Sequence, residues 1–131
     1  MPSDPKNEFT HTSIIRAASY ATNNAASAGF DTRGYTTGAL EVIVDIGVKT
    51  AGDNDGAIAV LVQSAANNTA SEATNVSTLN VSTTNNTAAL GQLQVDPRGT
   101  FRYLFLRRVI TGTNSPAYPV SAVVVGKKQV Q

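Results

Sequence analysis

The chain has 131 residues, of which 41% are hydrophobic and only 15% are charged, and its net charge is +1. A single domain of this length buries about two-thirds of the surface of its unfolded chain, so it can build its own core. The absence of cysteine excludes disulfides, cysteine-bound metals and thiol catalysis, and the near-neutral charge predicts no general attraction to nucleic acid or membranes.

The first twelve residues, MPSDPKNEFTHT, are polar, contain two prolines and show no periodic pattern. We therefore expect residues 1–12 to form a flexible arm, either a frayed terminus or an arm that orders against a neighbouring protein. This stretch lacks the apolar segment of a secretory signal, and no apolar run approaches the length of a membrane-spanning helix. We expect a protein that is made in a cytoplasm and is not exported by a classical route.

Seven or eight β-strands are predicted from apolar residues that alternate with polar ones. Seven of them fall at residues 13–21, 39–47, 57–64, 75–82, 90–95, 101–110 and 117–126. The clearest is 39–47, where four alternate residues are apolar: Leu40, Val42, Val44 and Ile46. Glu41 and Asp45 lie on its other face, as in a sheet with one face in water. We predict that this strand forms an antiparallel hairpin with residues 57–64.

Residues 101–110, FRYLFLRRVI, follow a turn at residues 96–99 and form the longest apolar and aromatic run. Such residues fit a pleated strand, and both of its faces are largely apolar. This predicts a central strand, or one whose second face is covered by another subunit. Alternation sends Arg107 and Arg108 to opposite faces, and because arginine suits interface ion pairs, both are candidate contact residues.

The pattern of many strands, frequent turns and no convincing helix predicts an all-β protein. We expect a single-domain β-sandwich of jelly-roll type over residues 13–126, with a flexible N-terminal arm before it and a polar tail at 127–131. An immunoglobulin-like sandwich is the alternative.

Catalytic and metal-binding patterns find little support in the sequence. The only histidine, His11, lies in the predicted arm, where partners cannot be fixed around it. Residues 53–56, DNDG, resemble the start of a calcium loop, but the twelfth position is Ser64 and not glutamate, so a turn is predicted. Glu41 and Asp45 would be about 13 Å apart along a strand, too far for glycoside hydrolysis. We predict a protein that is not an enzyme and needs no metal or cofactor.

The sequence resembles the small jelly-roll decoration, or cement, proteins of tailed-bacteriophage heads. The similarity is carried by residues 31–35 (DTRGY), the strands at 40–47 and 58–64, the stretch 96–107 and the closing strand at 120–126. It implies a virion structural protein that binds the outside of the capsid and stabilises contacts between major capsid subunits. The implied partners are the major capsid protein and further copies of the chain, expected as a homotrimer, with no nucleic acid or membrane.

The family has no catalytic residues to transfer, so candidate contacts with a subunit or the capsid come from this chain alone. They are Phe9 and His11 in the predicted arm, together with Arg107 and Arg108. Two alternatives with the same fold stay open: a structural protein of the virion tail or neck, and a host-surface module that binds glycans. A glycan platform would use Tyr20, Tyr35 or Tyr118, although core packing is expected for each.

Overall fold

A computed structural model describes residues 8–20, 25–35, 40–97 and 100–128. The regular secondary structure of the described residues is strand, apart from one short 3₁₀ turn, η2 (Ala70–Glu72). The strands are β1 (Glu8–Tyr20), β2 (Ala25–Ala26), β3 (Phe30–Asp31), β4 (Leu40–Ile46), β5 (Ala57–Ala65), β6 (Thr74–Thr84), β7 (Ala89–Val95), β8 (Tyr103–Thr111) and β9 (Tyr118–Lys128).

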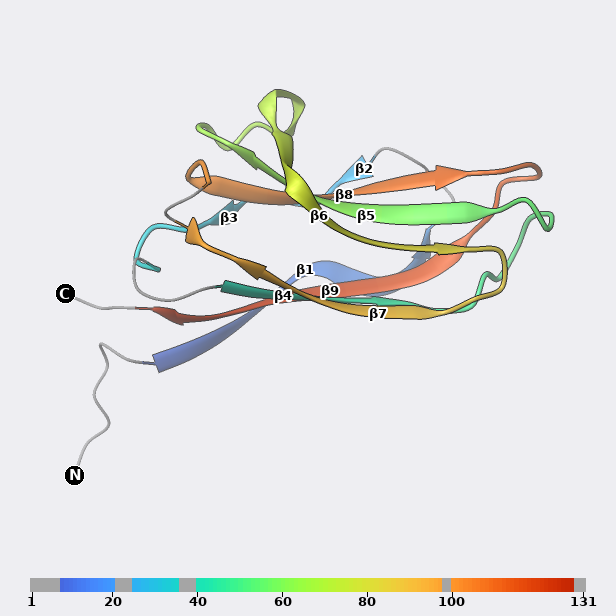
Figure 1. Cartoon of the computed structure of the whole chain (residues 1–131), viewed down its shortest axis with the longest axis horizontal. Helices are drawn as coiled ribbons and strands as arrows, with labels where there is room; N and C mark the ends of the chain where they lie inside the picture. Colours follow the sequence, from blue (N-terminus) through green and yellow to red (C-terminus); the bar gives the residue numbers. More distant parts are fainter. Residues whose placement is uncertain (1–7, 21–24, 36–39, 98–99, 129–131) are drawn as a thin grey trace.

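The strands form two antiparallel sheets that pack face to face (Figure 1). The four-stranded sheet has the order β1-β9-β4-β7. The five-stranded sheet has the order β2-β8-β5-β6, and β3 also pairs with β8. The predicted all-β sandwich is therefore confirmed, and β8 is an interior strand, as its apolar faces predicted.

The pairing of the strands is nested along the chain. The first strand pairs with the last in β1–β9, the next pairs are β2–β8 and β4–β7, and the innermost pair is β5–β6. Successive pairs alternate between the two sheets. The chain is thus one long antiparallel ribbon, folded back and forth so that its apolar faces meet.

The predicted hairpin between the strands at 39–47 and 57–64 is wrong. β4 pairs with β7 and β9, whereas β5 pairs with β6 and β8 in the opposite sheet. The connection at 47–56 therefore crosses from one sheet to the other. Alternation identifies the face of a strand that is buried, but it does not identify the neighbouring strand, because that choice depends on the whole set of strands.

The predicted ends of the sandwich also need correction. β1 begins at Glu8, so residues 8–12 belong to a strand and not to a flexible arm. They pair with β9 in a regular register from Glu8↔Lys128 to Thr12↔Val124, which also extends β9 two residues past the predicted end at 126. Backbone hydrogen bonds make this pairing, so it needs no apolar side chains and leaves no periodic signal. Residues 1–7 and 129–131 of the predicted arm and tail lie outside the described residues.

The core lies between the sheets and uses the alternate residues that the sequence predicted. Leu40, Val42, Val44 and Ile46 of β4 are at most 1% exposed, and the buried face of β9 is Tyr118, Val120, Ala122 and Val124. One end of the core depends on Gly126, because a Cβ there would meet the Leu40 side chain and lie 2.8 Å from the Tyr35 ring. Tyr35 is buried at this point, and its hydroxyl bonds the Thr10 hydroxyl of β1 at 2.6 Å.

Candidate functional site

No catalytic or metal-binding cluster is present among the described residues. Within that part of the chain, no three histidine, cysteine or acidic side chains lie close enough to hold a metal ion. Glu41 and Asp45 lie on β4 at positions that point away from the core, as the sequence predicted. The described polar side chains take part in hydrogen bonds and in ion pairs, such as that between Arg102 and Asp31 at 2.9 Å.

The DNDG segment forms a turn held by the loop that precedes β9. Thr113 donates its backbone N–H to Asp55 at 3.0 Å, and its hydroxyl lies 2.9 Å from Asp55 and 3.0 Å from Asp53. The side-chain amide of Asn114 donates to Asp53 at 2.8 Å. The two bonds from Thr113 to Asp55, the backbone one first, lower the pKa of Asp55. The predicted turn is confirmed, and its carboxylates serve to join two loops.

Two of the predicted contact residues lie on β1. Phe9 is paired with Lys127 and His11 with Val125, both in the ladder between β1 and β9. The His11 side chain is exposed. His11 is thus presented by a paired strand, which is a better platform for a specific contact than a flexible arm would be.

The other two predicted contact residues occupy opposite faces of β8, as alternation required. Arg107 points away from the core and donates to the Gln63 side chain at 2.8 Å and to the Ala70 carbonyl at 3.2 Å. Gln63 is itself buried and donates to Asn75 at 2.8 Å. Arg107 therefore fastens the connection between β5 and β6 to the outer face of β8.

This connection explains the second apolar face of the long strand. Phe105, on the same outer face as Arg107, is only 2% exposed. A Cβ on Gly29 would meet both the Asn68 side chain and the Phe105 ring, the latter at 3.1 Å, so three segments converge here. At Phe105 and Arg107 the covering comes from the chain itself, and the second-subunit alternative is not required at these two positions.

Arg108 closes the open side of the sandwich between β1 and β2. Its guanidinium carbon lies 3.6 Å from the centre of the Tyr20 ring, a cation–π contact. The Tyr20 hydroxyl donates to the Arg16 carbonyl at 3.0 Å, which fixes the ring. A hollow of about 230 Å³ remains beside this pair, with Ile14 and Ser27 in its wall.

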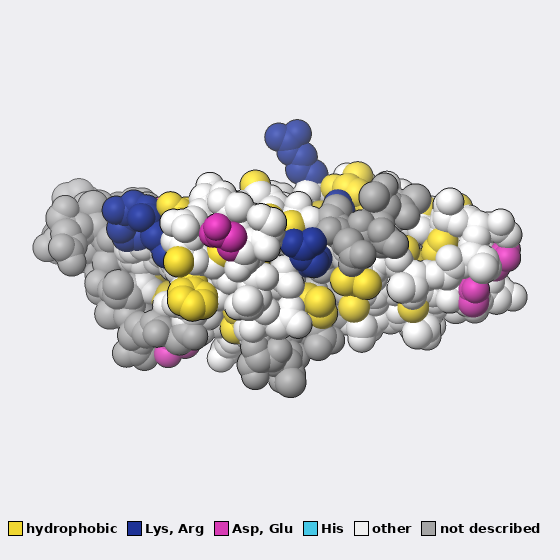
Figure 2. Space-filling model, turned by 90° about the horizontal axis from the view of Figure 1, so that it is seen from above, with side chains coloured by type: hydrophobic (Ala, Val, Ile, Leu, Met, Phe, Trp, Pro, Cys, Tyr) yellow, Lys and Arg dark blue, Asp and Glu magenta, His cyan; other side chains and the backbone are white. Residues whose placement is uncertain are grey.

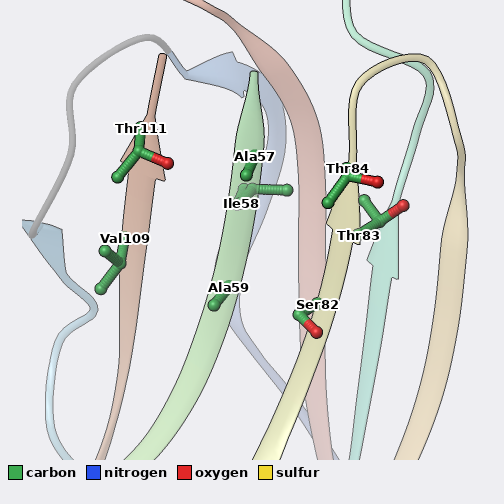
Figure 3. A pocket seen from close by; sticks show the side chains of 8 residues that line it. All are labelled: Ala57, Ile58, Ala59, Ser82, Thr83, Thr84, Val109 and Thr111. Carbon is green, nitrogen blue, oxygen red and sulfur yellow. The ribbon is translucent and has the colours of Figure 1, made fainter. Parts of the chain in front are cut away.

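A shallow groove of about 450 Å³ lies over β5, β6 and β8 (Figure 3). Its lining is made of small or uncharged side chains: Ala57, Ile58, Ala59, Ser82, Thr83, Thr84, Val109 and Thr111. With no acid, base or aromatic ring in the lining, the groove offers shape and hydroxyl groups only.

Charges are sparse over the five-stranded sheet, where Figure 2 shows a few basic and acidic side chains among many polar and apolar ones. The longest uncharged stretch runs from residue 73 to 95, and it also contains no proline. It includes β6 and β7, which are edge strands of the two sheets. The low charge of this segment is evident in the sequence, but its position at the edges of both sheets is not.

Sequence reasoning also missed Gln63 and Tyr20 as partners of the two arginines. A signal for Gln63 was present, since a glutamine that interrupts the apolar strand 57–65 needs a hydrogen-bond partner when it is buried. Tyr20 gave no comparable signal, because its neighbour comes from a strand more than eighty residues away.

Comparison with models of protein families and with curated proteins finds no match for the chain. In the described part, no helix has the length and hydrophobicity that crossing a membrane requires.

Proposed function

We propose that the chain is a virion structural protein that decorates a bacteriophage capsid. It would bind the outside of the shell and stabilise contacts between major capsid subunits. The observation that carries the proposal is the nested strand order, β1-β9-β4-β7 against β2-β8-β5-β6. This order supports a jelly roll, the fold implied by the resemblance to decoration proteins and one that recurs in viral capsid domains.

The surface supports the same proposal. Decoration needs a stable, compact scaffold with surface for protein contact, and it needs no chemistry. The described residues provide a sandwich with sparse charges, no catalytic cluster, and an exposed His11 held on a regular strand. Fold alone hosts many functions, so the resemblance of the sequence narrows the proposal to the capsid.

The glycan-binding alternative finds less support in the aromatic side chains. Sugar platforms require exposed rings, but Tyr35 is 6% exposed and Tyr118 is fully buried. The Tyr20 ring lies beneath the Arg108 guanidinium. Two of the three candidate tyrosines are therefore buried, and one face of the third is covered by an arginine.

Copy counting tests the proposal directly. Purified chain is mixed with capsids that lack it, the capsids are pelleted, and bound copies per capsid are counted. Saturation at hundreds of copies, together with greater heat resistance of the capsid, is the expected result. Absence of binding would refute it, and saturation near a dozen copies would move the protein to the neck or tail.

A surface variant tests the predicted contact at β1. His11→Glu changes an exposed side chain, so the fold should persist, and capsid affinity should fall several-fold if this end of β1 faces the shell. Ser71→Glu, an equally exposed site on η2, is the matched control and should bind as the parent chain does.

A further inference from the structure

β7 differs from every other edge strand in the described part of the molecule. Proteins protect sheet edges with charges, bulges or very short strands, because unpaired backbone groups invite another strand. β1 carries two register shifts and the charged Glu8 and Arg16, whereas β2 and β3 have two residues each. β6 has a register shift between its pairings with Leu61 and Gln63. Each of these edges has at least one protective feature.

β7 has none of these features. Its seven residues pair with β4 in an unbroken register, from Leu40↔Val95 to Ile46↔Ala89. Its sequence, ALGQLQV, contains no charge and no proline, and the nearest charged residues along the chain are Glu72 and Asp96. Among the described strands, none pairs with its outer side. β7 therefore presents a regular row of backbone donors and acceptors.

The side chains of β7 match a second copy of themselves. In an antiparallel pair centred on Gln92, each Gln92 faces its equivalent, and the two amides can exchange hydrogen bonds because each is both donor and acceptor. Gly91 falls opposite Leu93, which sets the smallest side chain against a large one. Leu90, 70% exposed in the single chain, falls opposite Gln94. A two-fold pairing repeats every contact, so an uncharged strand avoids the like-charge repulsion that charged residues near the axis would create.

We propose that β7 pairs antiparallel with β7 of a second copy of this chain, about a two-fold axis at Gln92. The pairing joins two four-stranded sheets into one continuous sheet. It is independent of the proposed capsid function, and it gives a dimer where the resemblance to decoration proteins implies a trimer.

Single cysteines test the register, because the chain has no cysteine of its own. Gln92→Cys places the two thiol-bearing residues opposite each other, about 5 Å apart between Cα atoms and within disulfide range. Leu90→Cys is at an exposed position too, but the register holds its two Cα atoms about 14 Å apart. Ser71→Cys is an exposed control on η2.

Under mild oxidation at micromolar concentration, Gln92→Cys should form a covalent dimer at least about tenfold faster than either control, since only its geometry permits the bond. Equal rates for Gln92→Cys and Leu90→Cys, or no cross-link at Gln92→Cys, would overturn the proposal.

A charge variant gives an independent measurement. Gln92→Lys brings two positive charges together at the axis, whereas Ser71→Lys adds the same charge elsewhere. Sedimentation should find dimers for the parent chain and for Ser71→Lys, and monomers for Gln92→Lys with unchanged circular dichroism. A parent chain that is monomeric or trimeric over the concentration range would contradict the two-fold pairing.

Discussion

The two sides of the sandwich, at β1 and at β7, are closed by different means. At β1, side chains connect the strand to other segments: Arg108 stacks on Tyr20 at 3.6 Å, and Thr10 bonds Tyr35 at 2.6 Å. Register shifts and charges interrupt the free edge there. At β7, pairing with β4 is regular and the free edge is uncharged. The difference indicates that the β1 side is completed within the chain, whereas the β7 side is suited to a partner strand.

The largest expected effect is on the free energy of unfolding, and it differs between the apolar side chains that β1 and β7 contribute to the core. Ile15 is 4% exposed and is the only fully buried described side chain of β1, so Ile15→Ala should cost about 3 kcal/mol of the free energy of unfolding. Leu93 of β7 is only partly buried, and Leu93→Ala should cost about 1 kcal/mol. Urea denaturation, carried out in the Gln92→Lys background, measures both. Equal losses of unfolding free energy in the two variants would show that β1 and β7 contribute equally to the stability of the core.

Arg108 tests whether a side chain closes the β1 side. Arg108→Ala removes the guanidinium from the Tyr20 ring together with the packing of its stem, and should cost about 1–2 kcal/mol. Arg108→Lys keeps the charge and most of the stem, so it should recover part of this loss. Chemical denaturation gives both values, and an alanine variant as stable as the parent would refute the closing role.

Two tyrosines allow a matched test of the polar contact at β1. Tyr35→Phe loses the bond to Thr10 and should cost about 1 kcal/mol. Tyr118 is also buried, but its hydroxyl has no hydrogen-bond partner among the described residues, and burial raises its pKa. Tyr118→Phe removes an unsatisfied group and should be neutral or stabilising. The reverse ranking of the two melting temperatures would contradict this assignment.

The smallest expected effect concerns Asp55, which lies in a loop and takes no part in the contacts at β1 or β7. It is a change in melting temperature that depends on pH. Because the pKa of Asp55 is lowered in the folded chain, its carboxylate stabilises the fold above the ordinary pKa of 3.8. This contribution is lost as the pH falls through the lower pKa of the folded state. Asp55→Asn should therefore slightly lower the melting temperature at pH 7 and leave it unchanged near pH 2. Thr113→Val should also lower the melting temperature at pH 7, by part of the amount seen for Asp55→Asn. If the difference in melting temperature between Asp55→Asn and the parent chain grew as the pH fell, the stabilising role of the Asp55 carboxylate would be contradicted.

The seven longer strands were predictable because their signal is local, whereas the two-residue strands β2 and β3 were not among the predicted strands. The alternation at Leu40, Val42, Val44 and Ile46 identified the buried face of β4 without reference to other strands. The same rule assigned Arg107 and Arg108 to opposite faces of β8, where Arg107 bonds Gln63 and Arg108 stacks on Tyr20. Side-chain direction in a strand repeats every two residues, so sequence spacing alone carries this information.

For the predicted contact residues, sequence spacing did not predict which distant segments they would lie beside. His11 was assigned to a flexible arm, yet it lies on β1 opposite Val125. The contact of Arg107 with a second subunit stays a prediction, but its hydrogen bonds to Ala70 and Gln63 of its own chain were not predicted. Both outcomes depend on segments distant in sequence, and no spacing within a strand reports on them.

The sequence by itself therefore determined the seven longer strands, their buried faces and the all-β class, because each follows from the pattern of apolar side chains along a few residues. The two-residue strands β2 and β3 were not predicted. Only the tertiary structure decided that β4 and β5 belong to different sheets, that residues 8–12 extend β1, and that β7 is an unprotected edge. These features arise from backbone pairing, and the backbone donors and acceptors are nearly the same at every residue. Which of them pair is settled only when all the strands pack together.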